Sequence, residues 1–318
     1  MRGAGRRGAR SLLQGIASGY GELASAIRAI NTELLTDDRE VAHYTSLHVL
    51  RDLAERGNPF RLYNSAYMND PEEGRVFFKI MKDEFSIDVK EYENDSEDSH
   101  SSPAYIGSFV QTGSRNKEGK DKLFLWRTYG KHNNEEAAGA CLIFDKDQFA
   151  RSMKTGTMPR LEYGVQQGLS TGQNDPLPLY RVIYKSEIGK LSKSLKKLAL
   201  SLEEINKLLP RRKRDRKMFI RAVRGQLDHI RFLFKADHYR GEEEVRVVQI
   251  FYDTGGHPPA GRKVELDQIP PRFYLEMPDD FRFNEVILGP KAGNVSEWKQ
   301  LVSEKNGITV EQSKIPFR

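Results

Sequence analysis

The chain has 318 residues, of which 38% are hydrophobic and 30% charged, and its formal net charge is +6 at pH 7. This length suits one large or two ordinary domains, and such a charge is common in soluble domains, so composition does not indicate nucleic-acid binding. The single cysteine, Cys141, excludes an internal disulfide and a cysteine-based metal site.

No apolar run reaches the length of about 18 residues that a membrane-spanning helix needs. The basic start "MRGAGRRGARSLLQGIAS" also lacks the continuous apolar stretch of a Sec signal peptide. The sequence therefore predicts neither a membrane span nor a Sec signal.

An N-terminal arm is predicted over residues 1–38. Residues 1–10 are rich in Gly and Arg, which predicts disorder. From Ser11 to Leu35 apolar residues recur at helical spacing, but Gly19 and Gly21 weaken the centre. Two short helices therefore fit this segment as well as one.

The body, residues 39–318, is expected to begin with alternating short elements. A helix capped by Thr45 or Ser46 and ended by Gly57 lies between two predicted strands. The turn at Asn69–Pro71 leads into another helix, and the polar segment after it is predicted to be a mobile loop. In order, the expected ranges are strand 41–44, helix to 56, strand 60–64, helix 75–86 and loop 88–102.

The rest of the body mixes strands and helices without a regular alternation. This mixture predicts an α+β fold rather than a doubly wound sheet. The final helix is expected to have a serine cap and a closing glycine. Strands are predicted at 104–111, 139–145, 179–184, 244–252, 285–289 and 308–315, and helical segments at 122–131, 187–237 and 296–307.

The stretch "HYRGEEEVRVVQI" places a block of carboxylates directly before a predicted strand. Neighbouring carboxylates repel each other, and a solvated turn is one interpretation of such a block. On an extended segment Glu242 and Glu244 would share a face, with Glu243 pointing away. Arg246 would continue that face and offset part of the repulsion.

Several stretches together resemble a family of bacterial proteins known as domain of unknown function 2971, which is related to the ADP-ribosyltransferase-like fold. They cover most of residues 41–318, whereas the arm and the segment 187–237 lie outside the resemblance. The insertion "TGSRNKEGKDK" also departs from the family's spacing. The matching stretches are "HYTSLHVL", "LYNSAYMNDPEEG", "IGSFVQ", "LFLWRTYG", "GACLIFD", "LYRVIY", "YRGEEEVRVV", "VILGPKAGN" and "VEQSKIPFR".

The resemblance implies a split mixed or antiparallel sheet with flanking helices, on which 187–237 is a helical elaboration. It further implies a mono-ADP-ribosyltransferase that cleaves NAD and transfers ADP-ribose to a macromolecular acceptor. Glu244 would stabilise the oxocarbenium-like ribose and Glu242 would face the acceptor. The residues implied to bind NAD are His43, Tyr44, Thr45, Asn69, Asp70, Ser108, Trp126 and Tyr129.

Each of these residues also has a structural interpretation. His43 could end a strand and Thr45 could cap the following helix. Asn69 and Asp70 could form an Asx turn. Trp126 is expected to be a core residue, whereas the hydroxyl of Tyr129 makes it the better ligand candidate.

A polar arm without a Sec signal would suit a toxin or virulence effector, in the bacterial cytoplasm or secreted into a host cell. Its acceptor would be a host protein, and ubiquitin modified on a hydroxyl residue is one candidate. The rival functions are a non-catalytic binding module and a metal-dependent nuclease that uses Asp70, Glu242 and Glu244. The basic run Arg211–Lys217 is expected to be a solvated helix face, as most such runs are. No aromatic residues lie among its charges, so base stacking is not supported and nucleic acid is not the expected partner.

Overall fold

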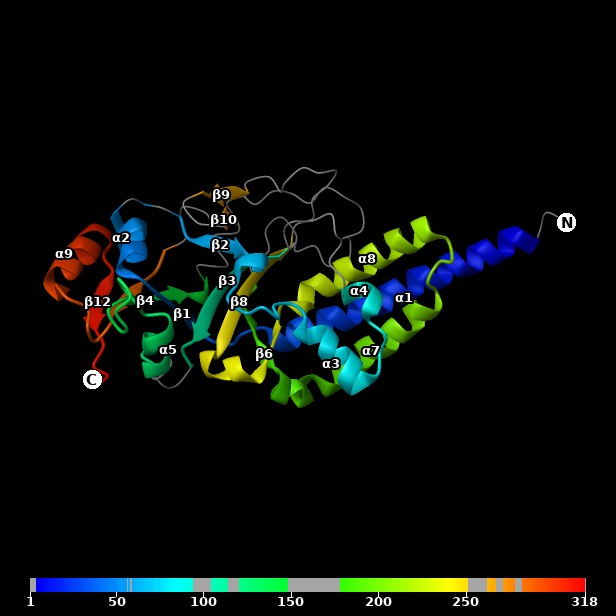
Figure 1. Ribbon diagram of the computed structural model, residues 1–318, viewed down its shortest axis with the longest axis horizontal. Helices are drawn as coiled ribbons and strands as arrows, with labels where there is room; N and C mark the ends of the chain where they lie inside the picture. Colours follow the sequence, from blue (N-terminus) through cyan, green and yellow to red (C-terminus); the bar gives the residue numbers. More distant parts are fainter. Residues whose placement is uncertain are drawn as a thin grey trace.

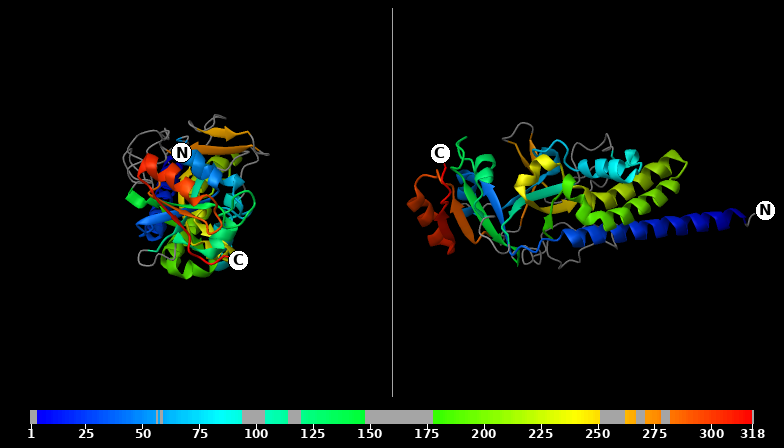
Figure 2. Two further views of the ribbon diagram at one scale, coloured as in Figure 1. Left: turned by 90° about the vertical axis from the view of Figure 1, so that its left-hand side faces the viewer. Right: turned by 90° about the horizontal axis from the view of Figure 1, so that it is seen from below.

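The protein combines a twisted sheet with an elongated arm of helices, as the computed structural model shows (Figure 1). The structure describes residues 4–55, 57, 59–93, 104–113, 120–147, 178–250, 262–266, 271–277 and 282–317. Among these, no helix is both long and apolar enough to cross a bilayer. The arm and the sheet lie end to end, so the molecule is much longer than it is wide (Figure 2).

Within the described residues, ten strands form one mixed, mostly antiparallel sheet, and β6 and β7 pair separately in parallel. The order along the main path is β12-β11-β4-β1-β3-β2-β10-β9, and β8 lies between β3 and β5. The strands are β1 Glu40–Thr45, β2 Arg61–Asn64, β3 Ala104–Gln111, β4 Ala140–Asp145, β5 Tyr180–Arg181, β6 Ile183–Tyr184, β7 Phe234–Lys235, β8 Glu244–Ile250, β9 Lys263–Glu265, β10 Arg272–Glu276, β11 Glu285–Leu288 and β12 Thr309–Gln312.

The helices divide between the two ends of the molecule. The arm contains α1, α3, α4, α7 and α8, whereas α2 and α9 pack at the far end of the sheet (Figure 1). The α-helices are α1 Ala4–Leu34, α2 Leu47–Glu55, α3 Val76–Phe85, α4 Lys90–Glu93, α5 Leu123–Thr128, α7 Ser192–Lys207, α8 Lys213–Arg231 and α9 Val295–Asn306. The 3-10 helices are η1 Ser65–Tyr67, η4 Lys185–Leu191 and η5 Asp237–Glu242.

Strand β3 divides the sheet. On one edge its two ends pair with different strands: Val110 lies opposite Ala42 of β1, and Ile106 lies opposite Tyr63 of β2. On its other edge β3 pairs with β8 along nearly its whole length. The sheet therefore splits at the middle of β3, while β8 stays continuous beside it.

The three largest hydrophobic clusters among the described residues hold these layers together. The first lies on the sheet face that α2 and α9 cover and includes Leu50 and Val302. The second fills the arm, where Ile27 and Ile30 of α1 meet α7 and α8, and Tyr180 of β5 and Val248 of β8 connect it to the main sheet. The third surrounds Trp126 of α5 on the opposite sheet face.

The predicted α+β class is confirmed, and so are most predicted elements. Ser46 Oγ accepts a hydrogen bond from the Val49 amide at the start of α2, and Gly57 has φ +62°, as the capping signals predicted. Residues 4–34 form one helix, so the single-helix alternative holds for the arm, and the disorder expected for residues 1–10 is wrong from Ala4 onward. A Cβ added at Gly19 would lie 3.3 Å from Ile205, so this glycine allows α1 to approach α7 closely.

Other boundaries differ from the predictions. The segment expected as a loop at 88–102 begins with α4, and the expected strand at 179–184 is divided into β5 and β6. Helix α9 begins after Asn294, whose φ of +55° is left-handed, rather than at a serine cap. Strand β7 lies where continued helix was expected, and β9 and β10 were not predicted. These short strands depend on partners that are distant in sequence.

Candidate functional site

The three consecutive glutamates lie where η5 meets β8. Glu242 ends η5, and Glu243 adopts the left-handed conformation with φ +45° before β8 begins at Glu244. The side chains of Glu242 and Glu244 consequently meet on one side, whereas Glu243 is exposed and pairs with Lys122 at 2.6 Å. The predicted shared face is confirmed, but its cause is the left-handed residue and not an extended segment.

Lys235 of β7 joins the two buried glutamates. Its Nζ donates to Glu242 Oε2 at 2.6 Å and to Glu244 Oε2 at 3.0 Å. Its ammonium also lies 4.4 Å from the ring centroid of Tyr239. One cation therefore bridges two carboxylates that would otherwise repel each other in a buried site.

Arg246 lies two residues further along β8 and is fully buried. Its Nε and Nη2 contact the two oxygens of Glu244 at 2.7 and 3.0 Å, and Nη1 and Nη2 contact those of Glu73 at 2.6 and 2.9 Å. Nη1 also donates to the Phe232 carbonyl at 2.5 Å. The guanidinium thus makes two bidentate contacts with carboxylates, the strongest geometry for this pair.

Local sequence explains how Glu73 reaches Arg246. Asp70 Oδ1 accepts the Glu72 amide at 2.9 Å, which confirms the Asx turn. Gly74 then adopts φ +73°, and an added Cβ would lie 2.7 Å from the Phe232 ring. Only glycine allows this turn to lie so close to the end of α8.

These contacts shift the pKa values of the buried groups. Burial alone would raise the pKa of Glu244, but Arg246 and Lys235 outweigh it and lower the pKa to about 2. Burial raises the pKa of Glu73, and Arg246 offsets only part of that rise. Burial would lower the pKa of Lys235, but Glu244 and Glu242 outweigh burial and raise it. Glu244 and Lys235 therefore both remain charged near neutral pH.

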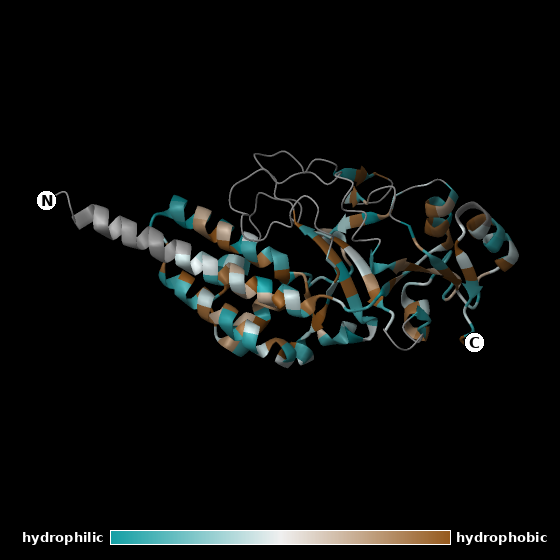
Figure 3. Ribbon diagram, turned by 180° about the vertical axis from the view of Figure 1, so that it is seen from behind, coloured by the Kyte–Doolittle hydropathy of each residue, from teal (hydrophilic) through white to brown (hydrophobic). Residues whose placement is uncertain are grey.

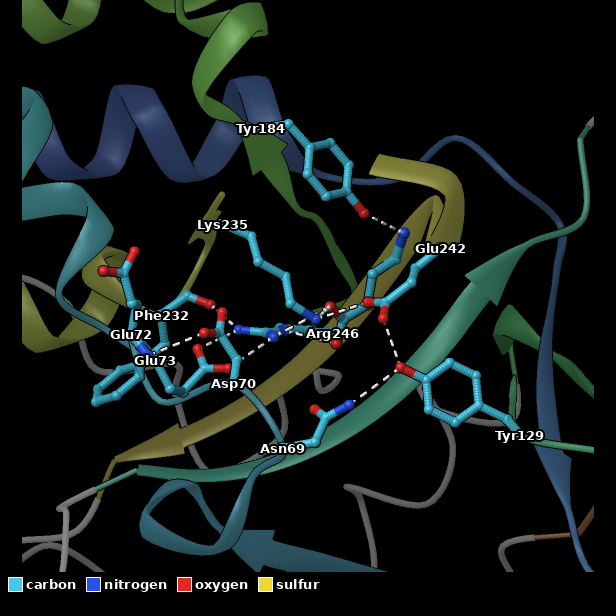
Figure 4. A network of polar contacts seen from close by, with 11 residues as sticks. Asn69, Asp70, Glu72, Glu73, Tyr129, Tyr184, Phe232, Lys235, Glu242 and Arg246 are labelled. Atoms are coloured by element: carbon cyan, nitrogen blue, oxygen red, sulfur yellow. Dashed lines mark hydrogen bonds and ion pairs between the residues drawn. The ribbon is translucent and has the colours of Figure 1, made fainter. Parts of the chain in front are cut away.

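Tyr129, at the end of α5, connects this cluster to the surface (Figure 4). Its hydroxyl donates to Glu242 Oε1 at 2.5 Å and accepts from Asn69 Nδ2 at 3.2 Å. Burial raises the pKa of Tyr129, and Glu242 raises it further. Asn69 is exposed, so Tyr129 and Asn69 form the outer side of the cluster.

The cluster contains more carboxylates than cations. Among the described residues, Asp70 is 4% exposed and its Oδ2 has no hydrogen-bond partner. With Asp70, the cluster contains four buried carboxylates but only two cations, Lys235 and Arg246. The excess of negative charge would favour a positively charged group of a ligand here. The acidic members are Asp70, Glu73, Glu242 and Glu244.

The structure does not bring His43 to this cluster. Glu244 lies opposite Val110 in the sheet, and Val110 lies opposite Ala42, so the three side chains are on the same sheet face. Successive side chains of a strand alternate between faces, so His43, next to Ala42, points to the other face of the sheet. His43 Nδ1 lies 2.9 Å from the Ser108 carbonyl, within the split between β1 and β2, and burial lowers its pKa. His43 therefore has a structural contact and no contact with the glutamates.

The remaining implied ligands divide between core and site. Trp126 is fully buried and donates to Asp121 at 2.6 Å, as expected of a core residue. Tyr44 lies beside Trp126, and its hydroxyl hydrogen-bonds to the backbone of Lys120 and Lys122. Thr45 is buried opposite Ala140 at the end of β1.

Ser108 of β3 lies in register with Arg246, and its buried hydroxyl is close enough to Glu244 to help lower the pKa of that carboxyl. Sequence reasoning missed Lys235 and Glu73. Lys235 lies in a segment that was expected to be helical, so no strand site was sought there. Glu73 lies in the motif "NDPEEG", which was identified as a turn and not as a source of a buried carboxylate.

A metal-dependent nuclease finds no support in this geometry. Among the residues described, no group of three or more His, Cys, Asp or Glu side chains is arranged to hold a metal ion. The position between Glu242 and Glu244 is taken by the ammonium of Lys235. A cation of the chain itself therefore lies between these two carboxylates.

Fold and site together define an α+β protein with a buried acid–base cluster at the junction of η5 and β8. A family model described as protein of unknown function DUF2971 matches residues 125–247, which supports the resemblance to that family. The matched range includes Tyr129, Lys235, Glu242, Glu244 and Arg246. It also includes the segment 187–237, so the expectation that this segment lies outside the resemblance is wrong. No match was found among curated proteins or among solved structures.

Proposed function

We propose that the protein is a mono-ADP-ribosyltransferase that cleaves NAD and transfers ADP-ribose to a protein acceptor. The observation that carries the proposal is the excess of buried carboxylates where Tyr129 and Asn69 reach the surface. Nicotinamide leaves a ribose that becomes positively charged, and fixed carboxylates stabilise such a transition state.

The two glutamates suit different steps. Glu244 is held by Arg246 and Lys235 with a pKa of about 2, so it supplies a fixed negative charge beside the ribose. Glu242 contacts the Tyr129 hydroxyl on the outer side, where an acceptor hydroxyl would approach. The bond from ribose C1′ to the nicotinamide nitrogen breaks, and its electron pair leaves with nicotinamide. The acceptor oxygen then bonds to C1′, and its proton passes to Glu242.

The proposal includes the wider expectations from the resemblance. The acceptor would be a host protein, with ubiquitin as the first candidate to test, and the enzyme would act as a bacterial effector. The position of His43 on the other sheet face removes it from the proposed binding residues. Asp70, Asn69 and Tyr129 are retained, because all three lie at the cluster (Figure 4).

One observation favours a non-catalytic binding module as a second candidate. Both oxygens of Glu242 and both of Glu244 already accept hydrogen bonds within the chain. A fully paired network of this kind can serve to hold the fold. In that case the cluster would position the surface around Asn69 for a partner without reacting.

The test measures nicotinamide release and acceptor labelling side by side for Glu244→Gln and Glu242→Gln. Glu244→Gln should lose both activities by roughly 10²–10³-fold, because a fixed charge at the transition state is removed. Glu242→Gln should lose labelling but retain slow NAD hydrolysis. Glu243→Gln is the matched control, since Glu243 lies between them and is exposed, and it should behave as wild type.

Tyr129→Phe provides a milder change that keeps the ring and removes only the hydroxyl contact with Glu242. It should fold normally and reduce labelling more than NAD hydrolysis. Absence of NAD consumption by the wild-type protein with every acceptor tried would favour the binding module. Equal loss of both activities in the Glu242 and Glu244 variants, with native circular dichroism, would reject the division of roles.

A further inference from the structure

The positive charge of the chain is concentrated on the helical arm. Residues 192–231, which form α7, α8 and the turn between them, contain thirteen Lys and Arg against four Asp and Glu. Their net charge of +9 exceeds the +6 of the whole chain, so the remaining residues sum to −3. The segment 192–231 and the rest of the chain therefore carry net charges of opposite sign, which the modest total does not reveal.

The end of the arm is the most basic part. Arg211, Arg212, Lys213 and Arg214 are all exposed where α7 turns into α8. The turn between α7 and α8, called the tip below, is at the end of these two helices that faces away from the sheet (Figure 1). The backbone of α1, whose sequence includes Arg6, Arg7 and Arg10, runs past this tip (Figure 2).

Exposed apolar side chains accompany these charges. Met218 follows the basic run on α8 and is 65% exposed, and Leu200 on α7 is 64% exposed. Arg214 and Met218 are four residues apart and share one face of α8. Figure 3 shows that both polar and apolar residues occur along these helices.

We infer that the tip of the arm binds anionic lipid bilayers peripherally. Clusters of four to eight basic residues on an amphipathic helix are attracted to acidic headgroups, and an exposed Met can enter the interface between headgroups and acyl chains. Nucleic acid would satisfy the charges but would leave Met218 exposed. The tip also lacks aromatic side chains for base stacking, since its sequence from 207 to 218 is "KLLPRRKRDRKM".

This binding is independent of the proposed enzymatic activity. The basic tip belongs to α7 and α8, whereas the glutamates lie at the start of β8 near the other end of α8. Attachment through the tip would hold the cluster away from the bilayer. It would therefore concentrate the protein on a membrane without covering Tyr129 and Asn69.

The experiment is sedimentation of the full chain with phosphatidylcholine vesicles that contain or lack phosphatidylserine. The wild-type protein should sediment only with the anionic vesicles, and added salt should release it. The triple variant Arg211→Gln, Arg212→Gln, Arg214→Gln should bind on the order of 100-fold more weakly, since each basic residue contributes about fivefold.

The matched control replaces Lys131, Lys299 and Lys314, three exposed lysines of the sheet half, with glutamine. It makes the same change in net charge and should bind like wild type. Met218→Ser should weaken vesicle binding and leave binding to a duplex oligonucleotide unchanged. Equal loss in both triple variants, or binding to the oligonucleotide but not to anionic vesicles, would overturn the inference.

Discussion

Glu244 keeps its charge in a buried position because Arg246 and Lys235 contact both of its oxygens. Its pKa of about 2 lies below the ordinary value of 4.5, so the folded state binds the proton more weakly than the unfolded state. The stabilisation is therefore complete above pH 4.5 and decreases as the pH falls towards 2. Glu73 has the opposite effect on the pH dependence of stability, because burial raises its pKa and the folded state binds its proton more tightly.

We expect Glu244→Gln to lower the free energy of unfolding by about 3–5 kcal/mol at pH 6, because it leaves Arg246 and Lys235 with less negative charge. Near pH 2.5 the unfolded state binds a proton at this carboxyl while most folded molecules still keep it charged, so the difference should shrink by about 2–3 kcal/mol. Urea unfolding at several pH values measures this. A difference that stays constant with pH would contradict the low pKa of Glu244.

Helix α1 packs on α7 through a contact that depends on one small residue. A Cβ at Gly19 would lie 3.3 Å from Ile205 Cγ1, whereas a Cβ at Gly21 would meet nothing within 4 Å. Both glycines reduce the helix propensity of α1 to the same extent. Packing therefore gives the two positions different roles.

We expect Gly21→Ala to raise the free energy of unfolding by about 1 kcal/mol, because alanine favours the helix and nothing opposes the methyl group. Gly19→Leu should lower it by about 1–3 kcal/mol, because the larger side chain forces α1 away from α7. Gly21→Leu is the control and should not be destabilising. Urea unfolding followed by circular dichroism distinguishes these outcomes, and equal effects of leucine at both positions would show that the close contact is absent.

The arm and the sheet are linked by a continuous core. The arm cluster includes Ile183 of β6 and Phe234 of β7, and Val248 of β8 packs against it. Strand β8 also contributes Val245 and Val247 to the cluster on the other sheet face. We therefore expect the molecule to unfold as one unit although it is elongated.

Two spectroscopic signals can test this expectation. Both tryptophans, Trp126 and Trp298, lie in the sheet half, so fluorescence reports the sheet, whereas far-UV circular dichroism is dominated by the long helices of the arm. Ile27→Ala in the arm should move the urea transitions seen by both signals to the same lower concentration, which corresponds to a loss of about 2–5 kcal/mol in the free energy of unfolding. Leu50→Ala under α2 should do the same. Separate transitions, each shifted by only one variant, would show that the two halves unfold independently.

The sequence by itself determined the α+β class and most strands and helices, and it predicted that Glu242 and Glu244 share a face, although not the left-handed Glu243 that causes this. Helical spacing, capping residues and apolar runs are local signals, so they predict secondary structure without knowledge of the fold. The motif "NDPEEG" predicted the Asx turn for the same reason. The family resemblance drew attention to Tyr129, which the structure places in contact with Glu242.

Only the tertiary structure decided which charges meet. Lys235 lies nine residues before Glu244 in the sequence, and Glu73 lies 171 residues before it. Both reach Glu244 only through tertiary contacts: Gly74 lets the turn that carries Glu73 approach α8, and β7, which carries Lys235, pairs in parallel with β6. The face on which His43 lies was likewise set by its register against β3 and not by its motif. Side-chain direction in a strand changes with each residue, so a cross-strand site depends on a register that sequence spacing does not encode.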